Sequence, residues 1–210
     1  MRRDMEIIWH GNTCFTFKGS SAIVVSDPYM EKGELKTPPL KADIVILTQE
    51  EGMNADAVAG VSKVIDWPGE YEAKDVLVMA LETEPNHSIF HLEMDGFKIA
   101  HLGSLNRKLS EEEVEKLGDV DLVMIPVGGG NALDPKLAHE VVEQIDPRMV
   151  IPMLYKIEGS TEDYTELEPF LKEMGSHSEP RESLIVKNRE ELPEDTTVFV
   201  VLTPKLGLRA

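Results

Sequence analysis

The sequence predicts a layered α/β protein, and we assign residues 1–210 to a single domain. Three observations indicate this class. Short runs rich in β-branched and aromatic residues fill the first half of the chain, an Asp-Gly pair marks a tight hairpin, and apolar strands alternate with helices in the second half. Antiparallel strands followed by β-α-β units are typical of proteins whose helices and sheets pack in layers. A chain of this length can bury a substantial core.

The first half is predicted to be mainly β-structure. Short apolar or alternating runs, bounded by polar or glycine-containing segments, indicate strands. The segment "MDGF" at 94–97 carries the Asp-Gly pair that is favoured in two-residue hairpin turns, so the flanking strands should pair directly. The strands predicted in this half cover residues 5–9, 13–17, 22–26, 43–48, 76–81, 88–94 and 97–102.

The second half is predicted to alternate helices with buried strands. Ser110 and Glu113 have the spacing of a capping box, and Gly118 is a typical end for the helix that they begin. Asp134 precedes Pro135, and proline is favoured at the first position of a helix. The predicted helices cover 110–118, 134–145 and 168–175, and the predicted strands cover 121–127, 149–154, 182–187 and 197–202.

Composition and charge exclude several classes of protein. The net charge of -18 argues against general binding to nucleic acid or to an anionic membrane surface, because both require basic patches. No apolar run approaches the roughly 20 residues that span a bilayer, and the N-terminal segment lacks the apolar region of a signal peptide. The single cysteine, Cys14, cannot form an internal disulfide. We therefore expect a cytoplasmic protein with no nucleic-acid or membrane partner.

Histidine is the first residue to consider for a metal site, since imidazole is a common metal ligand. Of the six histidines, only His87 and His91 are close in sequence. Phe90 and Leu92 share the apolar face of the strand predicted there, so His91 should project from the opposite face. A two-histidine metal site is one interpretation of this pair, and histidines on a surface strand are the favoured one.

Three further patterns are weaker evidence for a functional site. The loop "PVGGGNALD" at 126–134 lacks the Lys-Ser/Thr of a phosphate-binding P-loop, so a structural role is favoured over a phosphate site. Cys14 lies in an apolar strand, which is typical of an inert buried thiol. Ser104, Asp121 and His101 do not by themselves indicate a catalytic triad.

A polar loop, "TQEEGMNAD" at 48–56, follows the predicted strand 43–48. Gln49, Glu51 and Asn54 could combine with Ser104 in an all-oxygen cluster, which would suit Mg²⁺ or Ca²⁺ rather than Zn²⁺. The favoured interpretation is a polar loop that caps a helix beginning near Asn54.

Several segments together resemble the metallo-β-lactamase fold superfamily, and within it the UlaG-like group of Zn-dependent hydrolases. The likeness spans nearly the full chain, and it implies a four-layer αββα sandwich in which two mixed β-sheets pack face to face with helices outside. The segments that carry it are "IIWHGNTCF" (7–15), "VVSDPY" (24–29), "ADIVILT" (42–48), "DWPGEYEAKDVLV" (66–78), "MDGFKIAHLGSLNRKLSEEEVEKLGDVDLVMIPVGG" (94–129), "IDPRMVIPMLYK" (145–156) and "LPEDTTVFVVL" (192–202).

The resemblance also implies that a metal site should lie at one edge of the sandwich. One histidine, His101, is kept, and a further histidine position falls in the loop near Pro85, for which His87 is a loose substitute. The other ligand positions carry amides, apolar residues, a serine or a glutamate. The predicted remnant pocket consists of Asn12, Gln49, Glu51, Met53, Asn54, His101, Ser104 and Leu154.

These replacements would remove the zinc chemistry of the family. Leucine and methionine lack a suitable donor, amides and serine are poor zinc ligands, and without zinc nothing lowers the pKa of a bound water. We therefore predict no catalytic residue, no metal and no other cofactor. The favoured function is a non-catalytic protein that binds a small-molecule ligand or acts in an assembly such as a homo-oligomer. The alternative is a metal-dependent hydrolase with a rebuilt site around Glu51.

Overall fold

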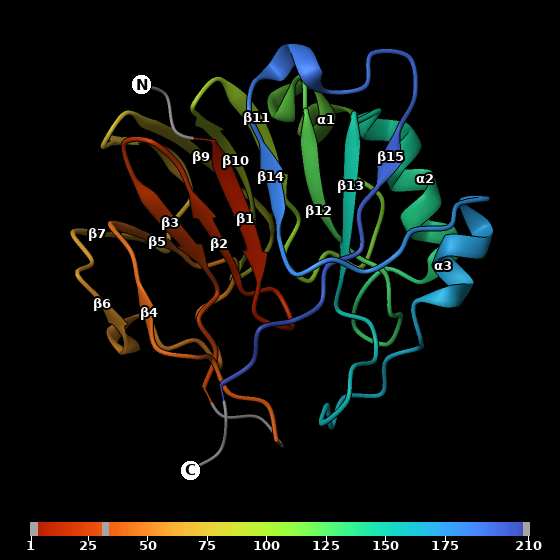
Figure 1. Ribbon diagram of the computed structural model, residues 1–210, viewed down its shortest axis with the longest axis horizontal. Coiled ribbons are helices and arrows are strands. Elements are labelled where there is room, and N and C mark those ends of the chain that lie inside the picture. The colour runs from red at the N-terminus through yellow and green to blue at the C-terminus, as the bar shows by residue number, and fades with distance from the viewer. Residues whose placement is uncertain (1–3, 31–33, 208–210) are drawn as a thin grey trace.

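A computed structural model describes residues 4–30 and 34–207, which form two mixed β-sheets packed face to face with α-helices outside (Figure 1). This arrangement confirms the predicted fold class. In strand order, the six-stranded sheet consists of β14 (Leu184–Val186), β1 (Met5–Trp9), β2 (Phe15–Lys18), β3 (Ile23–Ser26), β5 (Ile44–Ile46) and β7 (Lys63–Ile65). The seven-stranded sheet consists of β15 (Val198–Phe199), β13 (Met149–Met153), β12 (Leu122–Pro126), β11 (Phe97–His101), β10 (His87–Met94), β9 (Val76–Glu84) and β8 (Gly69–Ala73).

The main core lies between the two sheets. Alternation along the strands directs one set of side chains inward, as in β1, where every second residue is buried. Trp9, Phe15 and Phe17 from the six-stranded sheet meet Phe90 and Phe97 from the seven-stranded sheet, and all five are almost completely buried. Aromatic side chains of this size each remove roughly 150–250 Å² from water, so they supply much of the hydrophobic stabilisation.

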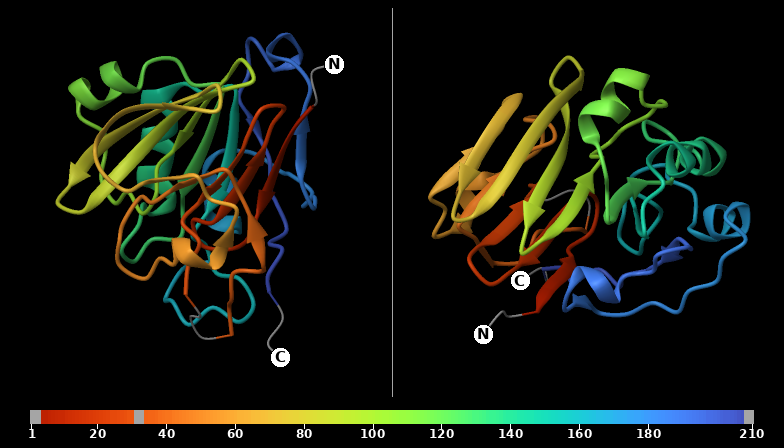
Figure 2. Two further views of the ribbon diagram at one scale, coloured as in Figure 1. Left: turned by 90° about the vertical axis from the view of Figure 1, so that its left-hand side faces the viewer. Right: turned by 90° about the horizontal axis from the view of Figure 1, so that it is seen from above.

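The helices begin at the residues that the sequence predicts. The Ser110 capping box is present, and the Asp134 carboxylate accepts a hydrogen bond from the Leu137 backbone N–H at 2.8 Å. α1 and α2 cover the outer side of the seven-stranded sheet, and α3 packs beside α2 (Figure 2). The α-helices are α1 (Glu111–Leu117), α2 (Pro135–Ile145) and α3 (Glu168–Glu173), and two short 3-10 helices are η1 (Ala55–Ala57) and η2 (Arg189–Glu191).

The predicted hairpin joins β10 to β11. Met94 pairs with Phe97 across a two-residue turn, in which Asp95 and Gly96 both have positive φ, of 53° and 87°. Two left-handed residues in succession define the type I′ turn that suits a twisted hairpin, which is why Asp-Gly is favoured there. From β11 onward β12, β13 and β15 follow in parallel, so the carboxyl ends of these strands reach the same edge of the sheet.

Three features differ from the expectation. On the outer face of the six-stranded sheet, the described residues place a layer with η1, β4 (Leu40–Lys41) and β6 (Val58–Ala59) rather than an α-helix. β7 and β8 were not predicted, because they are short or polar and glycine-containing. The last strand keeps only Val198–Phe199 of the range 197–202. Among the described residues, no helix combines the length and apolar character needed to cross a membrane.

Candidate functional site

The loops at one edge of the sandwich enclose a pocket of about 310 Å³, which we call the Glu51 pocket. β1, β3 and β5 run in the same direction, as do β11, β12 and β13, and the loops that follow these six strands supply the lining. Loops at the carboxyl ends of strands commonly hold ligands in α/β proteins. The lining residues are Asn12, Thr13, Tyr29, Met30, Gln49, Glu51, Gly52, Met53, Ser104, Asn131, Leu154, Glu162 and Tyr164.

Most residues of the predicted remnant pocket lie in this lining. Asn12, Gln49, Glu51, Met53, Ser104 and Leu154 are brought together from four loops. Asn54 does not line the pocket, because its backbone N–H donates to Pro28 O at 2.6 Å and leads the chain into η1. His101 does not line it either, because it is buried beneath the loops.

Glu51 and Gln49 are two of the polar residues in the lining, which also includes Asn12, Ser104, Asn131 and Glu162. The Gln49 side chain donates to the backbone oxygen of Glu51 at 3.1 Å and accepts from the Ser104 hydroxyl at 3.3 Å. Gln49 thereby links the loop after β5 to the loop after β11. The Glu51 side chain is exposed at the mouth, so its carboxylate can meet a ligand that enters from solvent.

His101 connects two loops below the pocket. Its Nε2 lies 2.9 Å from Thr13 O, and its Nδ1 accepts from the Gly103 backbone N–H at 3.2 Å. Burial lowers the pKa of His101 to about 4, so the ring is neutral near pH 7 and carries its hydrogen on Nε2. Both ring nitrogens are therefore engaged in the scaffold, and neither is free for a ligand.

Asp27 is a second buried group beneath the site, and the analysis of candidate residues from sequence did not single it out. Its carboxylate accepts from the backbone N–H of Thr48 at 2.7 Å and from the Thr48 hydroxyl at 2.8 Å. Burial raises the pKa of Asp27 to about 7, against the opposing effect of these hydrogen bonds. In the sequence, the Asp-Pro pair that follows the predicted strand 22–26 could have drawn attention to Asp27.

Three residues that follow strands at this edge have a left-handed backbone conformation. Asn12, Asp27 and Leu154 have φ of 47°, 42° and 51°, in the left-handed region that bulky residues such as leucine rarely adopt. The Leu154 carbonyl packs on Gly128, where an added Cβ would lie only 2.0 Å from Leu154 O. The glycine-rich loop is thus required by close packing, as its structural interpretation expects. Of the three, only Leu154 is an unusual residue for this conformation, so the strained backbone in the pocket lining is at Leu154.

Two other lining residues, Asn131 and Tyr164, escaped the sequence analysis. The Tyr164 hydroxyl donates to the Asn131 side-chain oxygen at 3.2 Å. Asn131 comes from the glycine-rich loop and Tyr164 from the segment before α3, so only the fold brings them together.

A family profile described as a β-lactamase superfamily domain matches residues 6–154, which include most of the pocket. The chain therefore belongs to the family described as the β-lactamase superfamily domain. A UPF0173 protein of Pyrococcus furiosus is 29% identical over 200 residues, which cover 81% of this chain and 90% of the relative. A UPF0173 metal-dependent hydrolase of Thermoplasma acidophilum is 24% identical over 189 residues, covering 72% and 84%.

Two solved structures have a similar fold. A protein of Thermotoga maritima, assigned to the Zn-dependent hydrolases of the metallo-β-lactamase superfamily, is 30% identical and has a TM-score of 0.83, covering 95% of this chain and all of its own. Igni18, a metallo hydrolase of Ignicoccus hospitalis, has a TM-score of 0.65 at 16% identity, covering 82% and 91%. This second likeness concerns the fold alone.

The names of the Thermoplasma acidophilum and Thermotoga maritima proteins contradict the expectation that the protein takes no cofactor, because they describe metal-dependent and Zn-dependent hydrolases. The donors present do not match a zinc set. Within residues 4–30 and 34–207, no group of three or more His, Cys, Asp or Glu gathers where it could hold a metal ion. The pocket offers oxygen donors instead, from the carboxylate of Glu51 and the amides of Asn12 and Gln49. Such donors fit a hard cation such as Mg²⁺ or Ca²⁺.

The paired histidines of β10 lie in different surroundings. His91 is buried, its Nε2 has no hydrogen-bond partner among residues 4–30 and 34–207, and burial lowers its pKa. The expectation of a surface position was wrong for His91, because the end of α1 covers this part of the strand. His87 is half-buried and lines a separate cavity beside Ser104.

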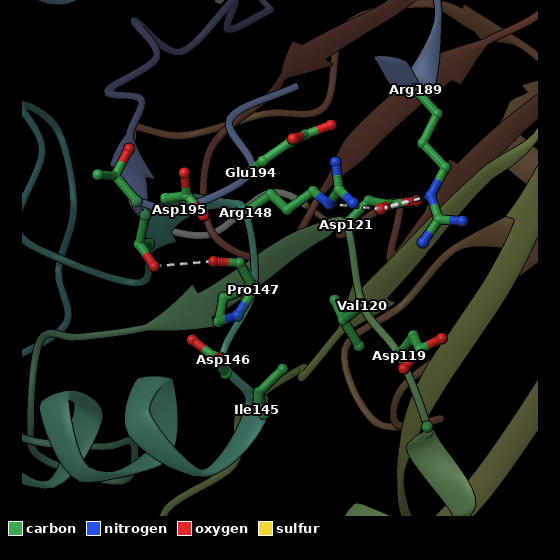
Figure 3. Close-up of a pocket in the computed structure, with 13 residues that line it drawn as sticks. Asp119, Val120, Asp121, Ile145, Asp146, Pro147, Arg148, Arg189, Glu194 and Asp195 are labelled. Atoms are coloured by element: carbon green, nitrogen blue, oxygen red, sulfur yellow. Dashed lines mark hydrogen bonds and ion pairs between the residues drawn. The ribbon is translucent and has the colours of Figure 1, made fainter. Parts of the chain in front are cut away.

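A larger cavity, of about 590 Å³, lies at the opposite edge of the sandwich, and Figure 3 shows the residues that line it. Its centre is the buried carboxylate of Asp121, which accepts from the Lys98 backbone N–H at 2.9 Å. Arg189 and Arg148 approach Asp121 from two further segments, with Nε–Oδ1 distances of 2.8 and 3.5 Å. Asp121 therefore ties chain segments together, and the candidate site remains the Glu51 pocket.

Proposed function

We propose that the protein is a hydrolase of the metallo-β-lactamase superfamily whose reacting groups lie in the Glu51 pocket. The observation that carries the proposal is the convergence of loops from both sheets on a pocket with the Glu51 carboxylate at its mouth. The names of the relatives support hydrolysis as the reaction class. The pocket thus represents a rebuilt version of the family's site.

Each polar group in the pocket has a role that its chemistry allows. The Glu51 carboxylate is placed to accept a proton from an attacking water, as general bases do. The amide groups of Asn12 and Gln49 can donate hydrogen bonds to an oxygen on which negative charge develops. Leu154 and Tyr164 are buried in the wall and limit the access of bulk water.

A divalent cation, which the relatives' names imply, would be held by the Glu51 carboxylate and the amide oxygens of Asn12 or Gln49, and would supply Lewis-acid stabilisation when bound. Native mass spectrometry with added Mg²⁺, Mn²⁺ or Zn²⁺ measures this without any assay of activity. We expect one hard cation per chain, and its loss in Glu51→Gln.

The central prediction concerns Glu51→Gln. The purified protein should hydrolyse at least one member of a panel of carboxylic esters, thioesters, lactones and phosphodiesters in the presence of a divalent cation. Glu51→Gln should lower kcat by about 10²–10⁴-fold, because it removes the carboxylate that accepts the proton and that would also hold the cation. Glu50→Gln is the matched control, since Glu50 is an exposed neighbour that does not line the pocket. Equal activity of the two variants would sink the proposal.

A second candidate function is ligand binding without turnover. It is favoured by the donor set, because no cluster of three metal-ligating side chains forms in the described part of the chain. Under this candidate the panel is not hydrolysed with any cation, while ligands still bind to the Glu51 pocket and compete with one another.

A further inference from the structure

A second cavity, of about 190 Å³, lies beside the Glu51 pocket. The two cavities share Ser104 and Asn131, so a single ligand could occupy both across these side chains. The second cavity is lined by Thr48, Thr83, Glu84, His87, Ser88, Leu102, Ser104, Leu105, Asn106 and Asn131.

The two cavities differ in chemistry. The Glu51 pocket has apolar walls from Met30, Met53 and Leu154. The second cavity has a floor of buried Leu102 and Leu105, and its remaining lining consists of hydroxyl, amide, carboxylate and imidazole side chains. A ligand that fills both should therefore have one apolar part and one part rich in hydrogen-bonding groups.

His87 is held at the second cavity by an irregularity in the sheet. His87 pairs with Glu84 while Ser88 pairs with Glu82, so the register between β9 and β10 shifts there and leaves Thr83 as an extra residue. Bulges of this kind occur next to active sites, where they re-aim side chains. The Thr83 carbonyl accepts from Arg107 at 2.6 Å.

Two contacts fix the start of β10. The Ser88 backbone N–H donates to Thr48 O at 2.8 Å, which joins this strand to the loop that carries Gln49 and Glu51. The Nδ1 of His87 lies 3.4 Å from Pro85 O, and donation to that carbonyl leaves Nε2 as a hydrogen-bond acceptor. An imidazole held this way suits a hydroxyl donor on a ligand.

We propose that the second cavity is a subsite for the polar part of a two-part substrate, and that His87 is the specificity-determining residue for that part. The substrate class is an ester or amide with an apolar acyl group in the Glu51 pocket and a hydroxyl-bearing alcohol or amine in the subsite. The inference rests on the proposed function, because it takes the Glu51 pocket as the place of reaction.

The test compares two butyrate esters, propyl butyrate and glyceryl 1-monobutyrate, which differ only in the two hydroxyls of the alcohol. Wild type should favour the glyceryl ester, and His87→Leu should lower kcat/KM for that ester by about tenfold, mainly through KM, with propyl butyrate little changed. His87→Gln, which keeps an acceptor, should restore most of the preference. His177→Leu is the control, because His177 is 87% exposed and lines neither cavity.

A binding measurement separates this inference from the hydrolase proposal. N-(2,3-dihydroxypropyl)butanamide is titrated into the Glu51→Gln protein, and the imidazole ¹⁵N resonances of His87 and His177 are followed by NMR. A shift at His87 alone supports the subsite even if no ester is hydrolysed. If the esters are cleaved by wild type without preference and the His87 resonances do not move, the subsite is overturned while the hydrolase proposal stands.

Discussion

Single buried residues beneath the site govern how the loops are held. Asp27 and His101 each satisfy hydrogen bonds from a neighbouring loop, and burial shifts the pKa of each toward its neutral form. The resemblance placed His101 in the pocket, since it identifies sequence positions but not the depth of a side chain. Asn131 and Tyr164 could not be found from sequence, because their separation along the chain carries no signal of their contact.

Asp27 should make stability depend on pH. Its carboxyl has a pKa of about 7 in the folded protein and an ordinary value of 3.8 when unfolded, so the folded state binds more protons between these values. Stability is therefore lost as pH rises from about 4 to 7, by roughly 4 kcal/mol at most. Asp27→Asn removes this term and keeps an acceptor for Thr48. Urea unfolding measures the free energy of unfolding of both proteins at pH 5 and pH 8. The stability of the variant relative to wild type should be greater at pH 8 than at pH 5. A difference that does not change with pH would contradict the raised pKa of Asp27.

At the scale of elements, local sequence signals predicted helices and hairpin well and the edge strands poorly. The Ser110 capping box and the Asp95-Gly96 turn depend only on residues close in sequence. β8, with the sequence "GEYEA", becomes a strand because it pairs with β9 along its whole length. Pairing partners of this kind override weak intrinsic propensity.

The start of α1 offers a test of such a local signal. The Ser110 hydroxyl accepts from the Glu113 N–H at 3.2 Å, and the Glu113 carboxylate accepts from the Ser110 N–H at 2.7 Å. Ser110→Ala should lower the free energy of unfolding by about 1 kcal/mol, whereas Ser110→Gly should lower it by only a few tenths of a kcal/mol. Thermal denaturation of the two variants measures the order, and the reverse order would refute the capping role.

At the scale of the whole molecule, one edge of the sandwich carries the candidate site and the opposite edge contributes to stability. The loops at one edge line the Glu51 pocket, while at the opposite edge the Asp121 carboxylate links several chain segments. That carboxylate joins the start of β11 to Arg148 before β13 and to Arg189 in η2.

Asp121→Asn should therefore destabilise the whole fold, by about 3 kcal/mol, because a buried charge paired with two arginines is removed. Asp119→Asn is the control, since the Asp119 side chain is 77% exposed in its pair with Lys98 and should matter far less. Chemical denaturation followed by far-UV circular dichroism compares the two. Similar losses in both variants would show that Asp121 does not fasten this edge.

The division between sheets and loops has a consequence for how such proteins diverge. The pocket residues sit on loops that follow six different strands, and the aromatic core lies between the sheets. Substitution of a few loop residues can thus change the chemistry of the pocket without altering the packing of the core between the sheets. The reaction of this protein therefore depends on the few side chains at that one rim rather than on the sheets that carry them.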